Sequence, residues 1–278
     1  MAKCIYCGKD AGWFNNAHKE CKAHHEAGIR QLQELLASCF QSHTDFYLKA
    51  TEVQTLIREH YLKPDDLETL YTECLDQAMQ SYLNDGLIDG QEKATVARFL
   101  QFTELPAATL NRNGAIEQML QAEVLADIIN GRTPAPKITI QGNFPFLLQK
   151  NEHLVWLFRS ITFYEQKVKR EYRGRSSGMS FRICKGVYYR TGGFKGHPVE
   201  TTYMQRIGTG DCCLTNRHLY FASPEKSIKI PFKKIMHLDS YSNGLGVNRD
   251  GANAKPLFFE GLNSWFCHNV ISNLAGEV

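Results

Sequence analysis

The sequence predicts an α+β protein of several domains: an N-terminal knuckle fused to an all-helical domain, then a small antiparallel β-barrel or sandwich with a C-terminal helix. Cysteine and histidine gather at the front, apolar residues recur with helical spacing as far as residue 129, and a period of two follows from residue 218. We therefore expect a knuckle over 1–25, a helical domain over 26–131, a linker over 132–136 and a β-domain over 137–278.

The composition is that of an ordinary globular protein. The formal net charge of +3 is too small for wholesale coating of nucleic acid, so a nucleic-acid partner is not expected. No apolar run approaches the roughly 18 residues of a membrane span, and the N-terminus lacks the apolar core of a signal peptide. Nine cysteines, an odd number with three clustered at the front, favour metal binding over disulfides. We expect a cytoplasmic protein with reduced thiols.

The first segment carries a set of metal ligands. Cys4 and Cys7 form a CxxC turn, and Gly8 lets backbone amides approach the sulfurs. His18 and Cys21 are three residues apart, so a helix presents them on one face. Four such ligands satisfy tetrahedral Zn²⁺ with no open position, which is typical of structural zinc. Since so short a segment cannot bury a core, the metal would supply its folding free energy. The segment resembles a CxxC…HxxC zinc knuckle.

Two further histidines follow Cys21. Either His24 or His25 could replace His18 as a ligand, but we favour the interpretation that both are exposed helix histidines. A redox role for the CxxC turn is not favoured, because no βαβ pattern surrounds it.

Apolar stripes of helical period predict five helices after the knuckle. They cover residues 16–41, 45–61, 64–83, 91–102 and 113–129. The first helix begins inside the knuckle, so the knuckle is fused to it. Pro and acidic residues suit the first turn of the third helix.

The turn over residues 84–92 contains three acidic side chains, Asp85, Asp89 and Glu92. It fails the calcium-loop pattern, which needs oxygen ligands at alternate positions and a final Glu. Asp89 with Glu92 fits a helix capping box instead. The turn resembles that of tellurite-resistance B-type helical domains, in which paired acidic residues are linked to metal; we carry over the helical fold alone. These three carboxylates are nevertheless the site of our alternative hypothesis, a metal-dependent enzyme.

Short strands dominate the last part of the chain. Residues 218–222 and 227–232 alternate apolar and polar side chains, which is typical of strands with one buried face. Turns are expected at 215–217 and 242–244, and a hairpin around 150–152 is expected to join strands over 146–148 and 154–163.

The segments TNRHLYF and KSIKIPFKKI resemble bacterial pleckstrin-homology-like and GRAM-like domains. The resemblance covers roughly the last half of the chain. It implies a seven-stranded, partly open barrel closed at one end by a C-terminal helix, for which the apolar stripe of residues 263–275 is the candidate.

Basic residues concentrate before a Ser/Gly stretch at 176–178, which we expect to be a turn. They are Lys167, Lys169, Arg170, Arg173 and Arg175. The resemblance implies that such a basic hairpin tip receives anionic headgroups, and an ordinary solvated loop is the alternative. Tyr172 is the one aromatic residue inside the cluster, whereas nucleic-acid binding favours several.

No nucleophile with a base partner stands out in the sequence. We expect a non-enzymatic, zinc-containing, cytosolic binding or adaptor protein that docks a protein partner or an anionic membrane surface through its barrel. The alternatives are the metal-dependent enzyme at Asp85, Asp89 and Glu92 and a zinc-dependent nucleic-acid binder.

Overall fold

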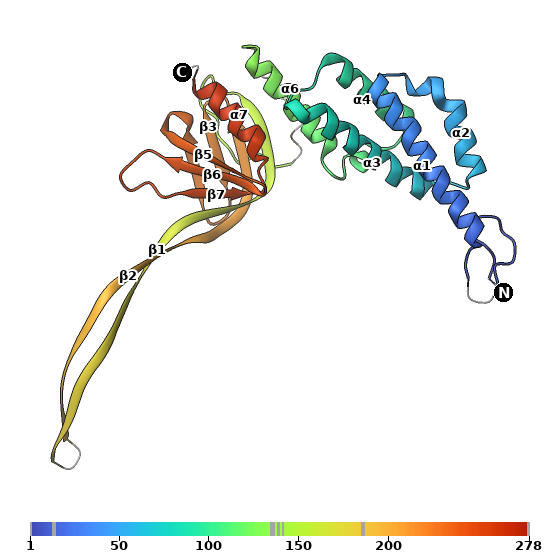
Figure 1. Cartoon of the computed structure of the whole chain (residues 1–278). Helices are drawn as coiled ribbons and strands as arrows, with labels where there is room; N and C mark the ends of the chain where they lie inside the picture. The colour runs from blue at the N-terminus through green and yellow to red at the C-terminus, as the bar shows by residue number, and fades with distance from the viewer. Residues whose placement is uncertain are drawn as a thin grey trace. The chain divides into compact units, whose positions relative to one another are not determined.

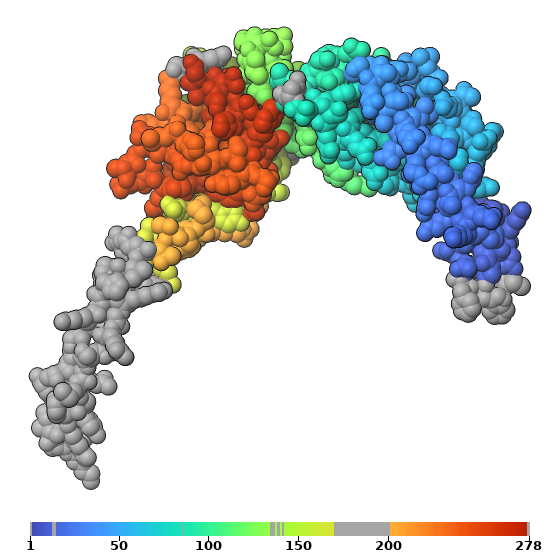
Figure 2. Space-filling model, viewed as in Figure 1, coloured from blue at the N-terminus to red at the C-terminus, as the bar shows by residue number. Residues whose placement is uncertain are grey.

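The computed structural model describes residues 2–12, 15–133, 137, 140, 142–184 and 187–276, and for Asp85 and residues 170–200 it describes no side chains. The chain divides into two compact units, Met1–Lys137 and Ile138–Val278. The first unit runs from blue to green in Figure 1 and Figure 2, and the second from yellow to red. Residues 134–136 of the predicted linker lie outside the described residues, so the linker stays a prediction.

The first unit is built from helices. They are α1 (Lys19–Ser42), α2 (Ala50–Glu59), α3 (Pro64–Tyr82), α4 (Gly90–Thr103), α5 (Ala107–Leu110) and α6 (Ala115–Ile129), with short 3₁₀ turns η1 (Phe46–Lys49) and η2 (Leu83–Asp85). All five predicted helices are confirmed, and α5 is an addition. Leu32, Leu36 and Phe40 recur at helical spacing on α1 and are buried at its contacts with α2, α3 and α4.

The acidic turn before α4 is a helix cap, as predicted. The Asp89 carboxylate accepts hydrogen bonds from the amides of Gln91 and Glu92, both at 2.7 Å, and the Glu92 carboxylate accepts one from the Asp89 amide at 2.9 Å. This reciprocal capping box satisfies amides that the first turn of a helix leaves without intrahelical partners.

The second unit holds one antiparallel sheet of seven strands and a final helix. The strands are β1 (Leu154–Cys184), β2 (Val187–Thr215), β3 (His218–Ala222), β4 (Ser227–Pro231), β5 (Ile235–Tyr241), β6 (Gly244–Arg249) and β7 (Leu257–Glu260), followed by α7 (Ser264–Ala275). Their order in the sheet is β4-β3-β2-β1-β7-β6-β5. Only the 3₁₀ turn η3 (Phe232–Lys234) joins β4 to β5, so the two ends of the sheet must approach each other there. The sheet therefore curls into a partly open barrel. The helices of the first unit and the sheet of the second confirm the predicted α+β class.

The inner face of the sheet is aromatic. Phe163, Phe221 and Phe259 come from three different strands, are almost fully buried, and have ring centroids 5.1 to 6.1 Å apart. Helix α7 packs against β5, β6 and η3, and its Phe266 meets the Trp156 ring at 5.6 Å. The predicted C-terminal helix is thus confirmed.

The predicted turn at residues 176–178 is wrong. These residues lie inside β1, where Ser176, Ser177 and Gly178 pair with Phe194, Gly193 and Gly192 of β2. β7 pairs with β1 only over Thr162–Glu165, so most of the β1–β2 hairpin is a two-stranded ribbon, which Figure 1 shows extending from the sheet. The predicted strand at 146–148 is also wrong, because that segment is irregular.

A buried carboxylate fixes the turn between β2 and β3. The side chain of Glu152 is fully buried and accepts hydrogen bonds from Thr215 Oγ1 at 2.6 Å, His218 Nδ1 at 2.7 Å and Tyr220 Oη at 2.9 Å. It accepts a fourth from the Gln149 amide at 2.7 Å. The predicted turn at 215–217 is confirmed, and Glu152 ties it to the segment that precedes β1.

Candidate metal centre

Four donor atoms converge at the N-terminus of the first unit. The metal-binding atoms of Cys4, Cys7, His18 and Cys21 all lie within 4.8 Å of one another. His18 Nδ1 is 3.3 Å from Cys7 Sγ and 3.6 Å from Cys21 Sγ. Zinc–sulfur and zinc–nitrogen bonds of ordinary length place such donors about 3.5 Å apart in a tetrahedron. The set therefore fits Zn²⁺ in both chemistry and spacing, and it contains the four residues that the sequence predicts.

The loop that carries Cys4 and Cys7 is shaped by backbone hydrogen bonds. The Gly8 amide donates to the Cys4 carbonyl at 2.9 Å, and the Cys4 amide donates to the Lys9 carbonyl at 2.7 Å. Gly8 has φ of +70°, a left-handed conformation that costs glycine little. A β-bridge between Lys3 and Asp10 closes the loop. These contacts hold both thiols on the same side of the turn.

His18 is oriented by a partner that sequence analysis did not identify. Its Nε2 donates a hydrogen bond to the backbone carbonyl of Asp10 at 2.8 Å. A carbonyl only accepts, so this bond places the imidazole proton on Nε2 and leaves the lone pair of Nδ1 directed at the sulfurs. Metal-binding histidines usually have such a second partner. The CxxC…HxxC spacing does not predict this hydrogen bond, because the acceptor is a backbone carbonyl.

The thiols differ in how readily they ionise. Burial opposes ionisation of Cys4, but hydrogen bonds from the backbone amides of Cys7, His18 and Tyr6 outweigh it and lower its pKa to about 6. Burial, together with the neighbouring Cys7 and Cys4 sulfurs, raises the pKa of Cys21 to about 11. Crowded sulfurs therefore resist full ionisation, and a divalent cation among them would remove that cost.

Neither alternative histidine joins the cluster. Nε2 of His24 donates to the Glu59 carbonyl at 3.0 Å, and its ring stacks on that of His60 with centroids 4.1 Å apart. Nε2 of His25 lies 3.0 Å from Asp66 Oδ2. The prediction of two exposed helix histidines holds for His24 but is wrong for His25, which is 6% exposed. His25 faces α3. No local sequence pattern predicts its contact with Asp66, because the two residues are 41 positions apart.

The knuckle also packs on the helices. Tyr6, inside the CxxC turn, lies with its ring 4.7 Å from the His25 ring, and Lys63 Nζ sits 5.9 Å from the Tyr6 centroid. Asp66 completes the contact by accepting from the Lys63 amide at 2.8 Å. The knuckle is thus attached to α1 by chain continuity and to the start of α3 by these side chains.

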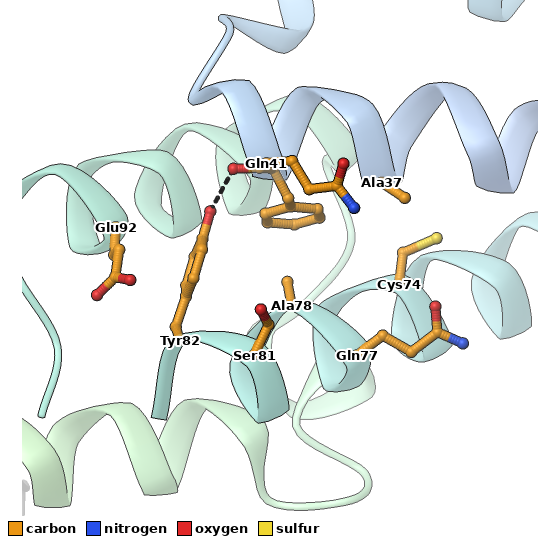
Figure 3. A pocket seen from close by; sticks show the side chains of 9 residues that line it. Ala37, Gln41, Cys74, Gln77, Ala78, Ser81, Tyr82 and Glu92 are labelled. Carbon is orange, nitrogen blue, oxygen red and sulfur yellow. Dashed lines mark hydrogen bonds between the residues drawn. The ribbon is translucent and has the colours of Figure 1, made fainter. Parts of the chain in front are cut away.

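The acidic turn does not make a second metal centre in the described part of the chain. A cavity of about 340 Å³ lies between α1 and α3, with Glu92 and Tyr82 at one end (Figure 3). Glu92 is its one carboxylate and already caps the Asp89 amide. The Asp85 side chain lies outside the described residues, and Asp89 does not line the cavity.

The five basic residues of the predicted anionic-surface site all lie on β1. Lys167 Nζ pairs with Glu165 Oε2 at 3.0 Å, and Lys169 is exposed. The side chains of Arg170, Arg173 and Arg175 lie outside the described residues. The basic stretch is therefore part of a strand and not a hairpin tip.

Exchange of one histidine tests the ligand assignment. His18→Ala is expected to reduce bound zinc at least tenfold, because it removes the donor that faces the three sulfurs. His24→Ala, the matched control, is expected to retain zinc. Metal analysis of both proteins after dialysis measures the difference, and equal retention would contradict the assignment.

Comparisons with known proteins add little to this geometry. No protein-family model matches the chain, and no curated protein matches it. Two solved structures, both crystal structures of the linker-DH/PH domains of p115-RhoGEF and one of them N-terminally truncated, match 94% of this chain and 73% of their own at 11% identity. Their TM-scores of 0.23 and 0.22 are too low to establish a shared fold. Among the described residues, no helix is long and apolar enough to cross a membrane.

Proposed function

We propose that this chain is a non-enzymatic, zinc-containing binding protein. In this proposal a structural zinc ion orders the knuckle of the helical unit, and the β-unit is a pleckstrin-homology-like module that docks on an anionic membrane surface. The observation that carries the proposal is the closed set of four donors, Cys4, Cys7, His18 and Cys21.

The donor set favours a structural role for the metal. A catalytic zinc ion usually has three protein ligands and keeps a fourth position for water or substrate. Here four side chains meet, and His18 is further held by the Asp10 carbonyl. Four protein ligands leave no position at which a tetrahedral ion could activate water.

The β1–β2 ribbon supports the docking role. Between residues 166 and 205 the sequence holds nine Lys or Arg and two Glu, so this segment carries more net positive charge than the whole chain's +3. Two strands without a third layer are only marginally stable in water, so a surface against which they bind would add stability. Each basic residue close to an anionic membrane contributes about 1 kcal/mol. A protein partner with an acidic surface is the alternative.

Vesicle binding tests the docking surface. The full chain is expected to sediment with vesicles containing phosphatidylserine at low salt and to be released as salt rises, because exposed charges are screened over about 8 Å at physiological ionic strength. Changing Lys169, Arg170 and Arg173 to Glu is expected to weaken binding at least tenfold. The melting temperature of the variant shows whether the fold is retained.

Three comparisons complete the experiment. Neutral vesicles should not bind. Exchange of three other exposed lysines, Lys233, Lys234 and Lys255, to Glu changes the net charge by the same amount and is the matched control. Failure of the wild-type protein to bind anionic vesicles at low salt would exclude the membrane role. Tighter, salt-dependent binding to duplex DNA than to vesicles would favour the nucleic-acid alternative.

A further inference from the structure

The outward face of β5, β6 and β7 carries a groove of about 360 Å³ that belongs neither to the metal centre nor to the basic stretch. Its lining comes from these strands, from the turn between β5 and β6, from the segment before β7 and from one residue of β2. The lining residues used below are Asp239, Tyr241, Gly246, Asn248, Phe258 and Met204.

Glycines occupy alternate positions of β6 on the groove's side of the sheet. Leu245 and Val247 point into the core and are almost fully buried, so Gly244 and Gly246 face outward. Gly246 pairs with Asp239 on one side and Phe258 on the other. A Cβ atom at Gly246 would lie 3.0 Å from Asp239 Cβ and 3.1 Å from Tyr241 Cε2. The side chains of Asp239 and Tyr241 therefore already occupy the space directly above Gly246, and these three residues line the groove together.

Aromatic rings line part of the groove. The Tyr241 and Phe258 rings meet edge to face, with centroids 5.5 Å apart and planes at 87°. Tyr241 is 51% exposed, and Met204, at the β2 end of the groove, is 42% exposed. So much exposed aromatic and apolar surface beside a hollow is typical of a binding site and not of an ordinary solvated sheet.

Two carboxylates lie on this same face. Asp239 accepts from His237 Nε2 at 3.0 Å and from Asn248 Nδ2 at 2.8 Å. Glu260, one row away, accepts from Tyr164 Oη at 2.8 Å. Among the described residues, neither carboxylate forms an ion pair with Lys or Arg. Asp239 is thus the carboxylate in the groove's lining, and Glu260 lies outside that lining.

We propose that this groove binds an arginine side chain presented by an extended segment of a partner protein. A guanidinium group is planar, so it can stack on the Tyr241 or Phe258 ring while donating two hydrogen bonds to Asp239. Each Asp239 oxygen has one partner and retains a lone pair for such a bond. The Asp239 carboxylate and the aromatic side chains that line the groove both match this ligand.

This inference gives the β-unit a protein ligand in addition to the membrane surface proposed above. The groove and the basic stretch contain different residues, so failure of either experiment leaves the other proposal intact.

Nuclear magnetic resonance of the full, ¹⁵N-labelled chain tests the groove. The probe is the blocked peptide acetyl-Gly-Arg-Gly-amide, with citrulline and lysine versions as neutral and non-planar controls. The arginine peptide is expected to shift the amides of Gly244, Gly246 and their neighbours with a dissociation constant of about 1 mM. Asp239→Asn should weaken binding about tenfold, and Glu225→Gln, an exposed acidic residue outside the groove, should not.

Specific results would overturn the proposal. Equal shifts with the citrulline peptide would show that charge is not recognised, and equal shifts with the lysine peptide would remove the assignment to arginine. An unshifted spectrum at about 10 mM arginine peptide would exclude the site. Unshifted resonances elsewhere in the Asp239→Asn spectrum control for misfolding.

Discussion

Replacing Cys4 and Cys7 by Ser is expected to reduce the zinc content of the purified protein from about one ion per chain to none and to unfold the knuckle. Cys4 is the one buried residue among the described residues 2–12 and 15–18, so this segment has no apolar core of its own. Structural zinc contributes about 10 kcal/mol or more to the folding of comparable small segments. Its loss cannot be offset by the few backbone hydrogen bonds of the loop.

Metal analysis and hydrogen exchange read by mass spectrometry measure this outcome. Amides such as those of Cys4 and Gly8 are expected to lose protection in the double variant, while peptides of the second unit remain unchanged. Cys74→Ala is the matched control, because it removes a buried thiol of α3 that lies outside the cluster. That variant should be less stable but retain zinc. Full zinc retention after Cys4→Ser and Cys7→Ser would contradict the metal centre.

The knuckle shows why local patterns predict ligands better than their surroundings. The CxxC and HxxC spacings are short, and chain geometry alone brings each pair together. The contacts that orient the site act over longer separations: His18 is held by Asp10, and His25 by Asp66. The His18 contact depends on the fold of the knuckle loop, and the His25 contact depends on how α1 packs against α3; no single motif encodes either one. The sequence therefore predicts an exposed His25, whereas the structure buries it.

The β-unit shows the same limit in another form. Strands β3 and β4 were predicted almost to the residue, because their apolar and polar side chains alternate. The β1–β2 ribbon was missed, since its Ser and Gly residues have low strand propensity and resemble a turn. Pairing with β2 overrides that preference, and the register places Gly174 opposite Gly196 and Gly178 opposite Gly192. These glycine pairs can be recognised only after the register of the two strands is known.

Glu152→Gln is expected to destabilise the second unit by about 3 kcal/mol, with a clear fall in its melting temperature. Four donors converge on this buried carboxylate, and an amide can accept at only one end. Burial opposes ionisation of Glu152, but hydrogen bonds from Thr215, the Gln149 amide, His218 and Tyr220 outweigh it and lower its pKa.

The lowered pKa makes stability depend on pH with a definite sign. The unfolded chain, with an ordinary Glu pKa of about 4.3, binds a proton more readily than the folded one, so stability rises with pH. The contribution of Glu152 is complete above about pH 4.3 and is lost as pH falls through its lower folded pKa. Urea unfolding of the wild-type chain between pH 3 and pH 6 should show this loss, and Glu152→Gln should show a flatter profile. Asp250→Asn, an exposed carboxylate in the same unit, should follow the wild-type profile. Parallel profiles for wild type and Glu152→Gln would show that the charge of Glu152 does not stabilise the fold.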